Sequence, residues 1–225
     1  MKKIRKPSFL AIIPARGNSK RIKDKNIRIF NGKPLIYWTI VAALKSKFID
    51  EVYVTSDDKR ILEISNQYAA NTITRPKKLS GPVIHGDIAM KHAYLKINKK
   101  FDYIIMLQPT CPLRTSKNID EAIKIILNKN YDSLLSVNLD TSFIWKKEKN
   151  FYKSINYNFR QRPRKQDVKF YKENGAIYIT KTKILLKNNN RLGGKIGIYN
   201  MKYEVSVDID TLSDFKIAEY YFKNK

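Results

Sequence analysis

The sequence predicts an α/β protein in which helices cover both faces of one mostly parallel, doubly wound sheet. From Phe9 onward, short apolar runs alternate with longer stretches that have the period of amphipathic helices. This alternation is typical of successive strand–helix–strand units. The length of 225 residues suits one such domain with a sizeable core and a small insertion, and is short for two full domains. We therefore expect a single three-layer domain over residues 1–225.

In the first half of the chain, each predicted strand is followed by a predicted helix. The strands are short runs of apolar or β-branched residues, at 9–15, 51–57, 71–76 and 102–110. The helices have apolar residues at helical spacing, at 33–46, 57–70, 86–97 and 116–130. Pro34 falls in the first turn of the first helix, where a missing backbone N–H is tolerated. Ser116 is a suitable N-cap for the fourth helix.

The second half interrupts this order once. A further strand is predicted at residues 131–138, but residues 138–171 are aromatic, basic and alternating in polarity. That pattern favours a hairpin or protruding insertion over another strand–helix unit. The alternation then resumes with a strand at residues 175–181, a short helix at 182–189 and a strand at 195–201. Residues 206–222 are predicted to be a strand end followed by a terminal helix.

The composition is strongly basic. Forty-five Lys and Arg against twenty Asp and Glu give a formal net charge of +25, which predicts attraction to nucleotides, nucleic acid, acidic sugars or anionic membranes without choosing among them. We attribute roughly half of the excess to solvated surface. No apolar run approaches the ~18 residues of a membrane span, so no membrane insertion is expected. The single cysteine, Cys111, allows no intramolecular disulfide and favours a cytoplasmic location.

The amino-terminal segment superficially resembles a signal peptide. It has a basic front and an apolar stretch, but the stretch is short, is broken by Pro14 and runs directly into charged residues. We interpret it as the first strand. Ligands of such sheets bind beyond the carboxyl ends of the strands, so the polar segments that follow strands are the places to look for a site.

The loop after this first strand combines backbone donors with cations. Gly17 permits a tight turn, and Ser19 adds a hydroxyl. The cations are Arg16, Lys20, Arg21 and Lys25. Such a loop suits a triphosphate, although the G-x-x-x-x-G-K-[ST] spacing of common phosphate loops is absent. A solvated basic loop is the alternative.

Near the carboxyl terminus, Asp208 and Asp210 are two residues apart. On an extended chain their side chains point to the same side, so both carboxylates can hold one hard cation such as Mg²⁺. The alternative is that Asp210 or Thr211 only caps the following helix. The pairing of an acidic pair with a basic loop, both at strand ends, favours a nucleotide site.

Other reactive residues are weaker candidates. His85 and His92 lack a third ligand nearby for a metal site, and Cys111 has no adjacent histidine that would activate it. The aromatic residues of the insertion suit either base stacking in a nucleic-acid groove or burial against the body or a second subunit. These aromatic residues are Trp145, Phe151, Tyr152, Tyr157 and Phe159.

Five segments, in order along nearly the whole chain, resemble the signatures of the acylneuraminate cytidylyltransferases, also called CMP-sialic acid synthetases, and their relatives for bacterial sialic-acid-like sugars. The first segment matches at Arg16, Ser19, Lys20, Lys25 and Asn26. The second is LQPTCPLR, with Gln108, Pro109, Thr110 and Arg114 in place and Cys111 where serine is usual. The others are RQRP, NGAIYI and DID, at residues 160–163, 174–179 and 208–210.

The resemblance implies a nucleotide-diphospho-sugar transferase-like fold and an enzyme that joins CTP to a nine-carbon nonulosonic acid, giving the CMP-sugar and pyrophosphate. The implied catalytic residues are Arg16, Lys25, Asp208 and Asp210. The implied nucleotide-binding residues are Arg16, Gly17, Ser19, Lys20, Lys25, Asn26 and Arg75. Asp208 and Asp210 would carry Mg²⁺ or Mn²⁺, and no side chain is an obvious general base.

The resemblance also implies a sugar pocket formed by Gln108, Tyr178 and Arg160, with Arg160 reaching the site from the neighbouring subunit of a homodimer. The sugar itself stays open among sialic, legionaminic and pseudaminic types. Residues 79–87, LSGPVIHGD, lack the Ser-Asp-Thr pattern common in sialic-acid enzymes. Enzymes for the eight-carbon keto sugar of lipopolysaccharide have a different first signature and rank lower.

Two other functions compete with this one. Another sugar nucleotidyltransferase, or a phosphatase, could use the same scaffold. A basic nucleic-acid-binding protein would explain the net charge of +25 most directly, but not the paired aspartates and Pro-rich turns at the strand ends. We therefore expect no specific nucleic-acid partner.

Overall fold

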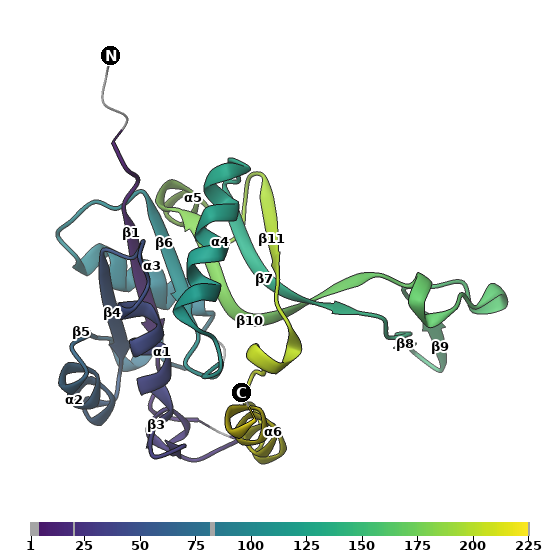
Figure 1. Cartoon of the computed structure of the whole chain (residues 1–225), viewed down its shortest axis with the longest axis horizontal. Helices are drawn as coiled ribbons and strands as arrows, with labels where there is room; N and C mark the ends of the chain where they lie inside the picture. The colour runs from purple at the N-terminus through teal and green to yellow at the C-terminus, as the bar shows by residue number, and fades with distance from the viewer. Residues whose placement is uncertain (1–4, 20, 82–83, 225) are drawn as a thin grey trace.

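The computed structural model describes residues 5–19, 21–81 and 84–224, and its centre is a seven-stranded sheet (Figure 1). The strand order is β11-β7-β10-β6-β1-β4-β5. The strands are β1 (Phe9–Pro14), β4 (Glu51–Ser56), β5 (Asn71–Thr74), β6 (Tyr103–Leu107), β7 (Ser133–Asp140), β10 (Phe170–Lys181) and β11 (Ile196–Asn200). Every neighbouring pair runs parallel except the two that involve β10. The mostly parallel sheet predicted from the sequence is confirmed.

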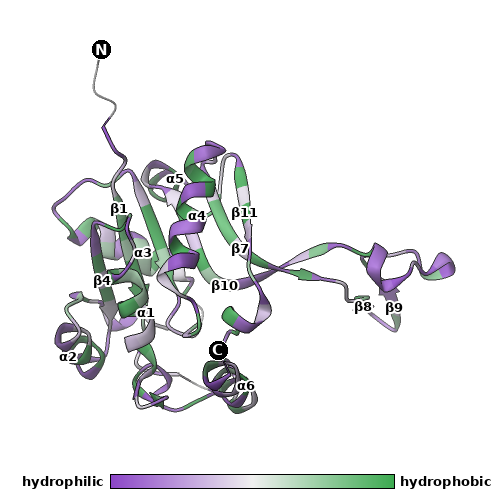
Figure 2. Ribbon diagram, in the orientation of Figure 1, coloured by the Kyte–Doolittle hydropathy of each residue, from purple (hydrophilic) through white to green (hydrophobic). Residues whose placement is uncertain are grey.

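Helices cover both faces of the sheet because alternate residues of each strand point to opposite sides. Ala11 and Ile13 of β1 pack in the cluster that contains α1, α2 and α4, whereas Leu10 and Ile12 pack with α3 and α5. Figure 2 shows the hydrophobic residues concentrated in the central strands between these layers. The helices are α1 (Leu35–Leu44), α2 (Lys59–Gln67), α3 (Gly86–Lys96), α4 (Ser116–Asn128), α5 (Thr182–Asn188) and α6 (Leu212–Lys223).

Two predicted helix starts need correction. Pro34 is not in the first turn of α1, because it pairs with Ile29 in a small hairpin of β2 (Ile29–Phe30) and β3 (Lys33–Pro34). The turn of that hairpin, Asn31 and Gly32, has positive φ angles of 46° and 77°, as a tight Asn-Gly turn requires. The N-cap of α4 is Thr115 rather than Ser116, since the Thr115 hydroxyl accepts from the backbone N–H of Asn118 in a capping box.

The predicted strand end at residues 206–210 is also wrong. These residues belong to no strand, and the segment is tied to the end of β6 by the backbone N–H of Ile209, which donates to the Thr110 carbonyl oxygen at 2.8 Å. After it, α6 packs Phe215 in a separate small core with Phe30. The acidic segment therefore crosses the edge of the sheet at which β1 and β6 end.

Between β7 and β10, the chain leaves the body as a long arm (Figure 1). The arm contains an antiparallel hairpin of β8 (Trp145–Glu148) and β9 (Phe151–Ser154). Trp145 donates to the Tyr157 hydroxyl at 2.8 Å, yet both Trp145 and Phe151 stay exposed. Within the described residues, no helix has the length and apolar character needed to cross a membrane.

Candidate nucleotide-binding site

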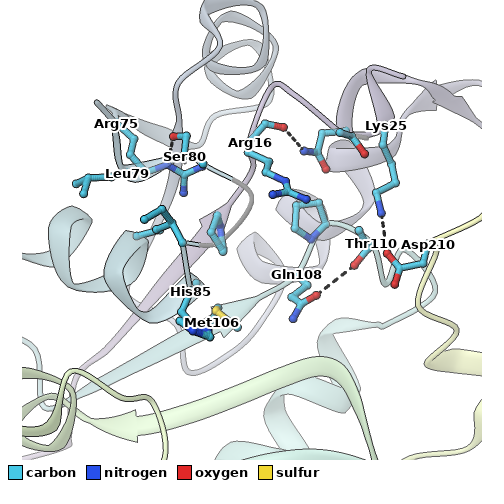
Figure 3. A pocket seen from close by; sticks show the side chains of 18 of the residues that line it. Arg16, Lys25, Arg75, Leu79, Ser80, His85, Met106, Gln108, Thr110 and Asp210 are labelled. Carbon is cyan, nitrogen blue, oxygen red and sulfur yellow. Dashed lines mark hydrogen bonds and ion pairs between the residues drawn. The ribbon is translucent and has the colours of Figure 1, made fainter. Parts of the chain in front are cut away.

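A cavity of about 430 Å³ opens where the parallel strands β1 and β6 reach their carboxyl ends (Figure 3). It is lined by residues from the loops after β1, β5 and β6, from the start of α3, and from the acidic segment before α6. Binding in this place is the general behaviour of open α/β sheets, because the loops after parallel strands converge at one edge.

The loop after β1 forms one corner of the cavity. Arg16, Ser19, Lys25 and Asn26 all line it. Asn26 donates from Nδ2 to the Arg16 carbonyl oxygen at 2.9 Å and so closes the loop on itself. Lys25 is only 8% exposed, and its ammonium group donates to the Ile209 carbonyl oxygen at 2.6 Å and to Asp210 Oδ1 at 3.2 Å. A cation this buried costs desolvation energy, which argues against the interpretation of a merely solvated loop.

Gly17 stands on the far side of the same loop. Its backbone N–H donates to Asp57 Oδ1 at 3.0 Å, and a Cβ atom at this position would lie 2.7 Å from the Cβ of Asp58. Glycine is therefore required by the close approach of the loop to the end of β4. Lys20, the other predicted phosphate ligand of this loop, lies outside the described residues.

The two aspartates lie on the same side of the cavity as Lys25. Asp208 and Asp210 both line it, and Asp210 also pairs with Arg21 at 2.8 Å. Thr211, with Asp214, supplies the capping box of α6, so the carboxylate of Asp210 is not needed as a cap. Burial raises the pKa of Asp208 above its ordinary value, a shift that a bound cation would oppose.

These carboxylates suit a hard divalent cation but make an incomplete site. In the described part of the chain, no group of three or more His, Cys, Asp or Glu residues could hold a metal ion. Two carboxylates together with phosphate oxygens and water are a common set of ligands for Mg²⁺. The residues present therefore fit a metal that arrives with a polyphosphate.

Arg75 marks a second corner of the cavity, after β5. It is 4% exposed, donates from Nε to the Ser80 hydroxyl at 2.8 Å, and lies 3.9 Å from the carboxylate of Asp57. Burial lowers the pKa of its guanidinium. Because its nearest carboxylate lies beyond hydrogen-bond distance, Arg75 keeps capacity for an anionic or carbonyl oxygen of a ligand.

Gln108 stands at the floor of the cavity, directly after β6. Its Oε1 accepts from the Thr110 hydroxyl at 3.3 Å. The turn that follows is held from beneath by Arg114, which is 2% exposed and donates to the carbonyl oxygens of Gln108 at 3.3 Å and Ala176 at 2.7 Å. Burial lowers the pKa of Arg114 to about 10. Arg114 thus supports the floor from below and does not line the cavity.

Tyr178 and Arg160, the other residues predicted for a sugar pocket, do not line this cavity. Tyr178 is buried in the core beneath it, with its ring 4.2 Å from the guanidinium carbon of Arg191. Arg160 is exposed in the short 3-10 turn Phe159–Gln161 between β9 and β10, and the arm formed by this part of the chain extends away from the body (Figure 1). Both assignments stay predictions, and that of Arg160 requires a second subunit.

Two cavity residues with ionisable side chains were not assigned to the site from the sequence. Arg191 lines the cavity from the loop after α5, and His85 lines it as the N-cap residue of α3. His85 was considered only as a metal ligand, and Arg191 lies in no motif or regular spacing. The lining thus contains four cations and two carboxylates: Arg16, Lys25, Arg75, Arg191, Asp208 and Asp210. This balance suits an anionic ligand accompanied by a cation.

The structure is an open α/β sheet with a charged cavity at the carboxyl ends of its parallel strands. The family model described as "Cytidylyltransferase" matches residues 10–223, and the chain belongs to that family. It is 35% identical over 214 residues to N-acylneuraminate cytidylyltransferase A of Danio rerio, a match that covers 93% of this chain and 49% of the relative. The chain therefore spans about half the length of that protein.

A relative of similar length is CMP-N,N'-diacetyllegionaminic acid synthase of Legionella pneumophila subsp. pneumophila, 33% identical over 228 residues, with 94% of each chain covered. Among solved structures, CMP:2-keto-3-deoxy-manno-octonic acid synthetase complexed with CTP aligns with a TM-score of 0.74 and 16% identity, covering 96% of this chain and 99% of that chain. At this identity the structural match shows the fold alone.

Proposed function

We propose that the protein transfers CMP from CTP to the anomeric hydroxyl of a nonulosonic acid and releases pyrophosphate. The observation that carries the proposal is the convergence of Lys25 and Asp210, from opposite ends of the chain, in one cation-lined cavity at 3.2 Å from each other. A polyphosphate needs a cation such as Lys25, and the metal ion that accompanies it needs a carboxylate such as Asp210. Membership of the cytidylyltransferase family and the names of the relatives support CTP as the nucleotide.

In this reaction the sugar hydroxyl oxygen attacks the α-phosphorus, a new P–O bond forms, and the bond to pyrophosphate breaks on the opposite side. The chain contributes mainly by positioning and by neutralising charge. Arg16, Ser19 and Lys25 hold the triphosphate with support from Lys20 and Asn26, and Gly17 allows the tight turn of the loop. Mg²⁺ or Mn²⁺ held by Asp208 and Asp210 would supply positive charge for the phosphate oxygens and lower the pKa of the attacking hydroxyl.

We assign the other two parts of the substrates to the rest of the cavity lining. Arg75 would contact the cytidine, and Gln108 at the floor would contact the sugar. The sugar class stays general here, because one relative is named for an N-acylneuraminate and another for a diacetyllegionaminic acid. CTP as a substrate makes the cytoplasm the expected compartment.

We further propose that the protein acts as a homodimer joined through the arm. Trp145, Tyr157 and Phe159 form a connected aromatic cluster at ring distances of 5.8 to 6.1 Å, and two of them, Trp145 and Phe159, are exposed. A second copy of the chain would cover this cluster and bring Arg160 towards the partner's cavity. Sedimentation equilibrium tests this, and a monomer at micromolar concentration would contradict it.

Pyrophosphate release tests the activity directly. Each of the four nucleoside triphosphates is incubated with Mg²⁺ and a panel of nonulosonic acids, and we expect release only with CTP and at least one sugar. Pyrophosphate release without any sugar would indicate hydrolysis of CTP to CMP, and release of orthophosphate instead would indicate a phosphatase. Pyrophosphate release with another nucleotide would indicate a different nucleotidyltransferase. Tight binding of random oligonucleotides at ~150 mM salt, with no turnover of CTP, would favour a nucleic-acid-binding protein.

A further inference from the structure

Arg191 occupies the corner of the cavity beside Gly86, away from the phosphate loop. A Cβ atom at Gly86 would lie 3.7 Å from Arg191 Nη1 and 3.4 Å from Met106 Sδ, which places the guanidinium next to the floor of the cavity. Figure 3 shows His85 and Met106 on the side of Gln108 that faces away from Lys25 and Asp210. This corner therefore stays open to the acceptor when the triphosphate occupies the phosphate loop.

The guanidinium is fixed in position on three sides. Asp87, in the first turn of α3, accepts from Arg191 Nη1 and from its backbone N–H, each at 3.1 Å. The ring of Tyr178 lies 4.2 Å below the guanidinium carbon, and the Glu173 carboxylate lies 3.9 Å from Nη2. Tyr178 in turn donates its hydroxyl proton to Glu173. Such a fixed guanidinium loses little conformational entropy when it binds a ligand.

The charges around Arg191 decide which ligand atom it can hold. Asp87 and Glu173 already place two carboxylates beside one cation, so a third carboxylate would meet net repulsion. Burial and the Glu173 carboxylate both raise the pKa of Tyr178, so its hydroxyl stays neutral and adds no charge. The hydrogen bond to Asp87 uses one of the five guanidinium N–H donors, which leaves donors that can bind an uncharged oxygen.

We propose that Arg191 is a specificity-determining residue that hydrogen-bonds a neutral oxygen of the acceptor sugar, an N-acyl carbonyl or a hydroxyl remote from its carboxylate. Asp87 and Tyr178 are positioning residues that act through Arg191. The carboxylate of the sugar then lies away from Asp87 and Glu173. This inference rests on the proposed function, because it assigns a part of the acceptor to one corner of the same cavity.

The test compares sugars with and without N-acyl groups. Pyrophosphate release is measured for the parental protein, Arg191→Met and Arg191→Lys, with N-acetylneuraminic acid, N,N'-diacetyllegionaminic acid and 2-keto-3-deoxy-manno-octonic acid. Met keeps the contact with the Tyr178 ring, and Lys keeps the charge without the planar fork. We expect Arg191→Met to raise KM for the preferred acylated sugar by about 10- to 100-fold, with KM for CTP unchanged.

The ratio of kcat/KM between acylated and non-acylated sugars identifies the oxygen. A ratio that collapses in Arg191→Met assigns the N-acyl carbonyl, whereas an equal loss for all three sugars assigns a hydroxyl that they share. Asp87→Asn should show the same pattern with a smaller change. The matched control is Arg5→Met, which breaks the Arg5–Asp102 ion pair of 2.8 Å away from the cavity and should leave both KM values unchanged.

Two results would overturn the inference. One is an Arg191→Met protein with parental KM for every sugar. The other is an equal rise of the KM for CTP and of the KM for sugar, which would indicate a general disturbance of the cavity. Where only the KM for sugar rises, CTP binding by calorimetry that is equal in the variant and the parental protein excludes misfolding as the cause. If the parental protein released no pyrophosphate with any sugar, the proposed function itself would fail, an outcome distinct from both.

Discussion

Replacing Lys25 with Met tests the phosphate corner with little change of volume. The Lys25 side chain is 10% exposed, and Met retains most of its buried aliphatic length while removing the ammonium group. Asp210 keeps its ion pair with Arg21 at 2.8 Å, so the substitution does not leave that carboxylate unpaired. The change therefore removes one buried cation from the cavity and little else.

The expected loss follows from the contacts of the ammonium group. A hydrogen bond to a charged group contributes about 1.5–3 kcal/mol, so losing the contact with the triphosphate should lower kcat/KM for CTP by roughly 10- to 150-fold. The Ile209 carbonyl oxygen also loses its donor at 2.6 Å. That loss should lower the free energy of unfolding by about 1 kcal/mol and Tm by about 2–4 °C.

The assay is initial-rate pyrophosphate release over a range of CTP concentrations at saturating sugar, with Tm from circular dichroism on the same samples. Lys23→Met is the matched control, because Lys23 is an exposed cation of the same loop that does not line the cavity. We expect near-parental kinetics for the control. Parental kcat/KM in Lys25→Met would refute the assignment of this loop to the triphosphate, whatever the change in Tm.

Three further changes probe the metal ligands, the support of the floor and acid stability. Asp210→Asn should abolish pyrophosphate release, because it removes one metal ligand, and should lower Tm slightly, because buried Lys25 loses its carboxylate partner at 3.2 Å; activity that still rose with Mg²⁺ to the parental level would contradict this. Arg114→Met should lower the free energy of unfolding by about 1–3 kcal/mol in urea titrations, since buried acceptors lose their donor. The backbone N–H of Lys195 and the ammonium of Lys181 lower the pKa of Asp132, so its contribution to stability is present at neutral pH and is lost as pH falls below its unfolded pKa of about 3.9. Between pH 5 and pH 3, Tm should therefore fall less in Asp132→Asn than in the parental protein. An equal fall in both proteins would exclude Asp132 as a cause of the acid sensitivity.

The layers of the fold were predictable because burial imposes a characteristic spacing of apolar residues on each strand and each helix. Alternating residues of β1 pack on opposite faces of the sheet, and this is visible in the sequence as a short run that is apolar throughout. The errors occurred where a tertiary contact decides the conformation. Pro34 is held in a hairpin by pairing with Ile29, and the acidic segment by one backbone bond from Ile209, neither of which has a local periodic signal.

The candidate site was predictable where its residues lie in recognisable sequence segments. Arg16, Lys25 and Asp210 were found in this way, and the structure brings all three to one cavity. Arg191 was not found, because its position depends on the antiparallel insertion of β10 between β6 and β7. The sequence shows a basic residue in a polar loop there, and only the packing against Tyr178 distinguishes it from the many other basic residues of the chain.

The large net charge is less informative than the burial of individual cations. An exposed cation such as Arg164, with its side chain 74% exposed, is well solvated and screened by salt, so it needs no functional explanation. A buried cation costs free energy unless a partner compensates for it. Lys25 and Arg75 are both less than 10% exposed, and both direct polar groups into a cavity that contains fewer carboxylates than cations. Their burial is what an anionic ligand would compensate, so the proposal of an anionic substrate rests on where these two cations lie and would remain if most of the surface lysines were neutralised.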